Sequence, residues 1–102
     1  MVLKLWLIIE VTKMNQHIHL SDMAEHDEFS KEMLEKLSNR IKSIRKEKGH
    51  SNYENFAFTH GFNHVQYGRY ERGSDLRFTS LVRIVKAFDM TLQEFFSEGF
   101  DD

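Results

Sequence analysis

The chain has 102 residues, which suffices for one domain with a modest core and excludes a large enzyme with a deep cleft. Cysteine is absent, which excludes disulfides and thiolate metal sites, and proline is absent, which suits an all-α fold without interrupted helices. The formal net charge is -2, but residues 33–73 hold eight Lys or Arg against four Asp or Glu, so positive charge gathers in the middle of the chain.

Residues 1–13 read MVLKLWLIIEVTK and contain an apolar run far shorter than the ~20 residues that span a bilayer. No small-residue cleavage site follows, so we expect a cytoplasmic protein without a membrane segment. The Val, Ile, Leu and Trp content favours a strand that pairs with a second subunit or folds over a helical core. A second interpretation stays open: an added or mis-assigned start, because Met14 and Met23 offer other beginnings.

Residues 15–28 are polar and lack clear periodicity, so residues 1–28 are interpreted as an N-terminal arm or linker, with dimerisation as one role. His17 and His19 would share one face of a strand, and His26 follows them. Without cysteine or a regular carboxylate pattern, these histidines do not predict a metal site, and no cofactor is predicted.

The first secure helix is predicted to run from Ser30, its expected N-cap, to Lys48. Gly49 provides the stop, and the basic residues of the last two turns complement the helix dipole. Apolar residues recur at steps of three and four and predict a core-facing stripe. They are Leu34, Leu37, Ile41 and Ile44.

Residues 52–73, NYENFAFTHGFNHVQYGRYERG, predict two short helices joined by a tight turn. Ala57 is small enough for two helices to approach closely, and Gly61 adopts the left-handed conformation that a reversal needs. Asn63 can cap the second helix, predicted over residues 63–72. Four aromatic residues are spaced to face inward. They are Phe56, Phe62, Tyr67 and Tyr70.

This pattern is typical of a DNA-binding helix-turn-helix. With the IKSIRKEKG run of residues 41–49 and the closing Glu71-Arg72-Gly73, residues 34–96 resemble the phage lambda repressor/Cro-like helix-turn-helix family. The resemblance implies a compact five-helix domain over residues 29–98 that binds double-stranded DNA. His60 stands where the family usually has leucine, so we expect a looser, partly solvated helix end.

In this family the second helix of the motif, here residues 63–72, is the recognition helix that enters the DNA groove. The resemblance also implies an ion pair between Arg45 and Glu71, which would fix the helix of residues 30–48 against the end of the recognition helix. Tyr53 stands where the family usually has a phosphate-contacting glutamine. Gly68 either lets the backbone approach DNA or is simply tolerated.

On the recognition helix, Gln66 is predicted to pair with adenine, Arg69 with guanine and Val65 with a thymine methyl group. The full predicted base-reading set is His64, Val65, Gln66 and Arg69. The predicted phosphate contacts are Asn52, Tyr53, Asn63, Arg72, Ser74, Arg77, Lys42 and Lys46.

A fourth helix is predicted over residues 79–88, after a loop that places Leu76 and Phe78 on the core. Thr91 is expected to cap a short fifth helix in a capping box with Glu94. The buried face of the fourth helix is predicted to hold Leu81, Ile84, Val85 and Phe88.

The chain ends in an acidic tail, residues 99–102, which should lie away from DNA. Near it, three aromatic residues exceed what a small core absorbs, and an exposed patch of them would indicate a dimer interface. They are Phe95, Phe96 and Phe100.

The sequence therefore predicts a DNA-binding transcriptional regulator, a repressor by preference, that acts as a homodimer. Two alternatives remain: an antitoxin whose residues 1–28 mask a toxin, and a protein-interaction module with the same fold that does not read DNA. An enzyme is not predicted, because no nucleophile–base spacing, phosphate loop or metal set is present.

Overall fold

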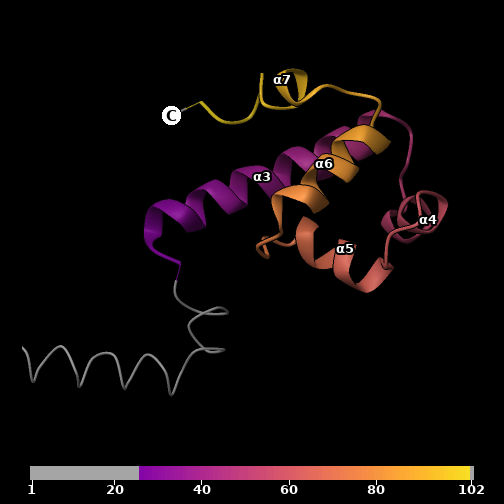
Figure 1. Cartoon of the computed structure of the whole chain (residues 1–102), viewed down its shortest axis with the longest axis horizontal. Coiled ribbons are helices and arrows are strands. Elements are labelled where there is room, and N and C mark those ends of the chain that lie inside the picture. The colour runs from indigo at the N-terminus through magenta and orange to yellow at the C-terminus, as the bar shows by residue number, and fades with distance from the viewer. Residues whose placement is uncertain (1–25, 102) are drawn as a thin grey trace, which may run out of the picture. The chain divides into compact units, whose positions relative to one another are not determined.

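The computed structural model describes residues 26–101, which form five α-helices joined by short turns (Figure 1). No strand occurs in this part of the chain, so the all-α prediction is confirmed there. Residues 1–25, with the predicted strand, His17 and His19, lie outside the described range. No helix within residues 26–101 is long and apolar enough to cross a membrane. The helices are α3 (Glu28–Glu47), α4 (Tyr53–Thr59), α5 (His64–Glu71), α6 (Phe78–Ala87) and α7 (Leu92–Phe95).

Helix α3 starts two residues earlier than predicted, and Ser30 is not its N-cap. The carboxylate of Asp27 accepts a hydrogen bond from the Ser30 backbone N–H at 2.7 Å. This bond lowers the pKa of Asp27, since it favours the charged form of the carboxyl group. The prediction failed because aspartate and serine are comparable caps and both precede the periodic segment. At the other end, Gly49 has a φ of 90° and ends the helix as predicted.

The turn between α4 and α5 has the predicted construction. Gly61 has a φ of 76°, and the Phe62 backbone N–H donates to the Ala57 carbonyl at 2.8 Å. The side-chain oxygen of Asn63 accepts from the Gln66 backbone N–H at 3.0 Å, which caps α5. His60 is half-buried, with its ring centroid 4.6 Å from that of Phe56, so this helix end is partly solvated but packed.

The hydrophobic core lies within a compact unit of the chain, residues 31–102, and all five of these helices contribute to it. The ring centroid of Phe56 lies 5.3 Å from those of both Tyr67 and Phe88, so aromatic contacts join α4 to α5 and to the residue that caps the end of α6. In Figure 1, α5 and α7 lie on opposite sides of α6. The buried apolar residues are Ile41, Ile44, Phe56, Ala57, Tyr67, Leu81, Ile84, Val85, Phe88 and Phe95.

The buried face of α6 is confirmed, but Phe78 does not lie on the core. It is the first residue of α6 and is 61% exposed. Phe78 precedes Val82 by four residues, so both lie on the outer face of the helix, whereas Leu76 packs partly against the core.

The predicted exposed patch of three C-terminal aromatic residues is wrong. Phe95 is fully buried, Phe100 is half-buried, and Phe96 alone among them is exposed. The Phe95 ring packs against Phe96 and Phe100, with centroid separations of 5.0 Å and 6.3 Å. The core therefore takes up more of these rings than composition suggests. The capping box of Thr91 and Glu94 before them is confirmed.

A buried arginine that the motif does not include attaches the C-terminal segment to α3. Arg40 donates to the carbonyl oxygens of Phe95 at 2.7 Å and Glu94 at 3.1 Å. One turn earlier, the Lys36 ammonium donates to the backbone carbonyl of Asp101 at 2.9 Å. Residues 94–101 are thus tied to α3 through their main chain.

Candidate nucleic-acid interface

Helix α5 has one face committed to the core and one free for a ligand. Tyr67 and Glu71 are buried, whereas Val65, Gln66 and Arg69 are exposed. At about 100° per residue, these three exposed positions span an arc of about 100°. The structure therefore brings three predicted base-reading residues onto one face of α5.

His64, the fourth predicted base-reading residue, is placed differently. It is the first residue of α5 and is exposed. By helical spacing it lies on the opposite side from Arg69, so it belongs to the N-terminal tip of the helix and not to the face centred on Arg69. A contact from His64 would have to come from the end of α5.

Gly68 does not lie on this exposed face. It is buried against α4, and a Cβ atom at this position would lie 2.8 Å from Cε2 of Tyr53 and 3.1 Å from Nη1 of Arg72. The suggestion that Gly68 lets the backbone approach DNA is therefore wrong. The glycine makes room for the Tyr53 ring, which fixes the packing of α4 on α5.

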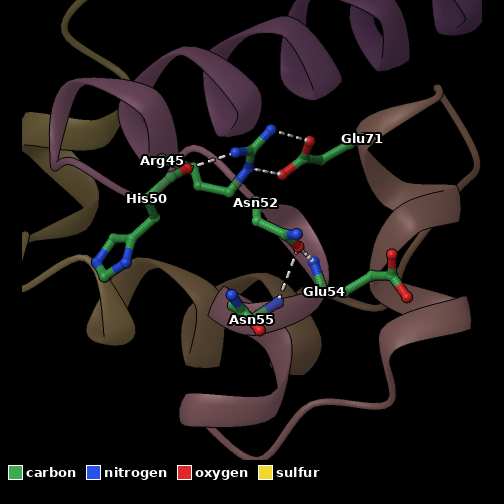
Figure 2. A network of polar contacts seen from close by, with 6 residues as sticks. All are labelled: Arg45, His50, Asn52, Glu54, Asn55 and Glu71. Atoms are coloured by element: carbon green, nitrogen blue, oxygen red, sulfur yellow. Dashed lines mark hydrogen bonds and ion pairs between the residues drawn. The ribbon is translucent and has the colours of Figure 1, made fainter.

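The two asparagines that cap α4 and α5 accept hydrogen bonds through their side chains, and their side-chain N–H groups donate none to residues 26–101. Asn52 accepts hydrogen bonds from the backbone N–H groups of Glu54 and Asn55 at 2.8 Å and 3.1 Å (Figure 2). This bonding, like that of Asn63, uses the side-chain oxygen. An amide group also carries two N–H donors, which remain chemically suited to a phosphate oxygen.

The predicted pair of Arg45 and Glu71 is present and bidentate (Figure 2). Nε of Arg45 lies 2.7 Å from one carboxylate oxygen of Glu71, and Nη2 lies 3.0 Å from the other. A third bond runs from Nη1 to the backbone carbonyl of His50. Each side chain is 5% exposed, so the pair is shielded from solvent. The carboxylate raises the pKa of Arg45, and the pair anchors the C-terminal end of α5 to α3.

The hydroxyl group of Tyr67 adjoins this pair and was not anticipated. It is buried without a hydrogen-bond partner in the described region. Burial raises the pKa of Tyr67, and the negative charge of Glu71 raises it further. Tyr67 therefore stays neutral and contributes its ring to the core.

The cations that could reach DNA phosphates come from two segments. Lys42 and Lys46 are exposed one turn apart on α3, and Arg72, Ser74 and Arg77 are exposed in the segment that follows α5. None of these four cations forms an ion pair with a residue between 26 and 101. Their charge is thus available for an anionic partner.

The first turn of α4 is less favourable for a phosphate than predicted, because it carries the exposed carboxylate of Glu54. Tyr53 is half-buried and its ring faces Gly68, so its hydroxyl group is held near the α4–α5 contact. Among residues 26–101, no three His, Asp or Glu side chains are grouped so as to hold a metal ion.

Comparison with known proteins adds no relative. No family model, no curated protein and no solved structure matches this chain. The functional interpretation therefore depends on the residues and geometry of α3, α4 and α5.

Proposed function

We propose that the protein is a sequence-specific double-stranded DNA-binding regulator with a lambda repressor-like fold, which inserts α5 into the major groove and represses transcription as a homodimer. One observation carries this proposal. The face of α5 with Val65, Gln66 and Arg69 is exposed, while the other face is fixed by Tyr67 and the Arg45–Glu71 pair. A reading helix needs this combination, because its side chains must be free while its axis is held still.

The exposed side chains suit the edges of base pairs. Gln66 can form two hydrogen bonds with adenine, and Arg69 can form two with guanine N7 and O6. Val65 offers an apolar contact to a thymine methyl group. His64, at the tip of α5, can donate to a neighbouring base or phosphate.

Exposed cations on α3 and in the segment after α5 support the same proposal. Lys42, Lys46, Arg72 and Arg77 are exposed and lack acidic partners in the described range. Ser74 and the amide groups of Asn52 and Asn63 add neutral donors. Contacts of this kind position a protein on DNA, and they make binding depend on salt concentration.

The proposal includes dimerisation because one copy would read only a short DNA sequence. A single recognition helix reads one half-site, so useful specificity needs two copies related by a two-fold axis. Their half-sites would lie about 34–36 Å apart, one turn of DNA. Phe95 does not take part in contacts between the copies, because it is buried.

The test is selection from a random duplex library with the purified protein at moderate salt. We expect a palindromic motif. Arg69→Ala should lose a guanine preference and Gln66→Ala an adenine preference, each by ~1–3 kcal/mol. Lys46→Ala should weaken all sequences alike and flatten the salt dependence.

Gln93→Ala, which alters an exposed residue of α7, is the control and should behave as the unmodified protein. The absence of any enriched motif would refute the proposal. Equal weakening of all sequences by Arg69→Ala and Lys46→Ala would refute the assignment of the reading face.

Binding of a protein partner is the second candidate, and Phe58 favours it. This side chain is 86% exposed on α4, and Phe78 is 61% exposed on α6. Large exposed aromatic side chains are typical of interaction surfaces. Such a partner would include the toxin of a toxin–antitoxin pair. In that case His64, Gln66 and Arg69 would tolerate alanine in cells, whereas Phe58→Ala would abolish activity.

A further inference from the structure

A groove runs between α5 and α6, beside the reading face. Its volume is about 250 Å³. Pockets for drug-sized ligands usually measure about 300–1,000 Å³, so this groove suits a more compact molecule. Its lining residues are Gly61, Phe62, Asn63, Gln66, Tyr67, Tyr70, Ser80, Arg83 and Ile84.

Four polar side chains of the lining have hydrogen-bonding capacity that no other residue of the described range uses. They are the amide of Gln66, the hydroxyl groups of Tyr70 and Ser80, and the guanidinium group of Arg83. None of the four forms a side-chain hydrogen bond or an ion pair with another residue between 26 and 101. They come from two helices, so the packing of α5 against α6 brings them to one place.

The charge of the groove is positive. Arg83 carries the one full charge among the lining residues, which include no aspartate or glutamate. The Arg83 guanidinium lies 5.2 Å from the centroid of the Phe62 ring, a cation–π contact that holds it over the groove. A held guanidinium with neutral donors beside it suits phosphate and carboxylate oxygens, which accept such hydrogen bonds.

We propose that the groove between α5 and α6 binds a small free anion of phosphate or carboxylate chemistry. Arg83 supplies the charge, and Gln66, Tyr70 and Ser80 supply hydrogen bonds. Gln66 belongs to both the groove and the reading face, so the bound anion draws its amide away from DNA. This second part rests on the proposed function, whereas binding of the anion does not.

The test of binding is an NMR titration of the full chain with inorganic phosphate, and separately with acetate, with chloride holding the ionic strength constant. We expect saturable shifts at the amides of Gln66, Tyr70 and Ser80 and at Nε–H of Arg83. Saturation by phosphate, by acetate or by both assigns the class of anion. Arg83→Gln should weaken binding by about tenfold or more, because it removes a charge-assisted bond.

Lys86→Gln is the matched control, because it removes an exposed cation of α6 that does not line the groove. It should leave the titration unchanged, and Ser80→Ala should weaken binding without altering the fold. Shifts that stay linear with concentration and scatter over all basic residues would mean adventitious anion binding only. That result would overturn the proposal, as would an unchanged titration of Arg83→Gln.

DNA itself could supply the same phosphate chemistry, and a second measurement separates the two sources. If the groove binds a free anion and not a DNA phosphate, the Arg83→Gln variant should bind duplex DNA in phosphate-free buffer as tightly as the unmodified protein. A saturating concentration of the anion should then change the base preference at the position read by Gln66 in the unmodified protein, but not in the variant. If Arg83 instead contacts the DNA backbone, the variant binds all duplexes more weakly and no free anion saturates the groove. The latter result overturns the inference. Failure of the proposed function has a different signature: no duplex binds at any anion concentration, while the titration still decides whether the groove binds an anion.

Discussion

Two arginines five positions apart on α3 are both buried, yet they do different work. Arg45 meets a carboxylate with two parallel hydrogen bonds, so its charge is neutralised by Glu71. Arg40 donates to the carbonyl oxygens of Phe95 and Glu94, and its ion-pair partner among residues 26–101 is Glu98, 3.6 Å away, whose side chain is 77% exposed. One arginine joins two helices through charge, and the other fixes the end of α7 through the main chain.

The difference shows what a sequence motif can reveal. Glu71 lies 26 residues from Arg45 and is itself part of the motif, so the pair could be predicted. The partners of Arg40 lie 54 and 55 residues away and are backbone atoms, which every residue possesses. No pattern of side chains identifies them in advance.

Breaking the Arg45 pair should have the largest effect. Glu71→Gln removes the charge at nearly constant shape and leaves a buried guanidinium without a counter-ion. We expect the free energy of unfolding to fall by about 3–5 kcal/mol in urea titrations. Replacing both partners, by Arg45→Met with Glu71→Leu, should recover most of this loss. A Glu71→Gln variant as stable as the unmodified protein would show that the pair is dispensable.

Breaking the Arg40 contacts should cost less and act locally. Arg40→Met removes the donors to Phe95 and Glu94, and we expect a loss of about 1.5–3 kcal/mol, typical of hydrogen bonds to charged groups. Amide hydrogen exchange should accelerate at Phe96 and Ser97 more than in α5. The Arg40→Lys variant, which retains a positively charged donor, should have a stability between those of the unmodified protein and Arg40→Met. Uniform acceleration over all helices would contradict a local role.

Alkaline pH should test Tyr67, whose buried hydroxyl group adjoins the Arg45–Glu71 pair. The folded protein raises the pKa of Tyr67 above its ordinary value of 10.0, chiefly through burial. The unfolded chain therefore releases this proton first, and stability should be retained below about pH 10 and lost as the pH rises further. Urea unfolding between pH 8 and about 11 should show this slope, and Tyr67→Phe should reduce it. Identical slopes in both proteins would count against the assignment.

Acidic pH should test the capping box of Glu94, the residue whose backbone carbonyl accepts from Arg40, and we expect the smallest effect on stability here. Backbone and side-chain hydrogen bonds from Thr91 lower the pKa of Glu94 below 4.5. A carboxyl group whose pKa is lower in the folded state than in the unfolded state stabilises the fold at pH values above its unfolded-state pKa. This stabilisation is lost as the pH falls through the folded-state pKa. The thermal stability of the Glu94→Gln variant should therefore depend less on pH between about pH 5 and pH 3 than that of the unmodified protein. A variant with the same acid dependence would exclude a contribution from this carboxylate.

Local chemistry made much of the fold predictable. The helix periodicity, the Gly61 turn and the caps at Asn63 and Thr91 each depend on residues a few positions apart, and the structure confirms them. The exposed face of α5 follows from the same spacing. That this face binds DNA stays a prediction.

Tertiary packing decided the rest. Phe95 is buried because Arg40 and the end of the chain close over it, which α7 alone does not reveal. Phe78 is exposed because α6 starts at this residue and turns it outward. Asp27 and Ser30 are comparable caps, and in the folded chain the carboxylate of Asp27 accepts from the Ser30 backbone N–H, so Asp27 is the cap.

The contact between Gly68 and Tyr53 has a consequence for evolution. A side chain at position 68 fits only if the ring at position 53 shrinks or moves, since its Cβ would lie 2.8 Å from that ring. Related chains are therefore expected to change these two positions together, a larger residue at 68 accompanying a smaller one at 53. A change at either site alone would tilt the two short helices against each other.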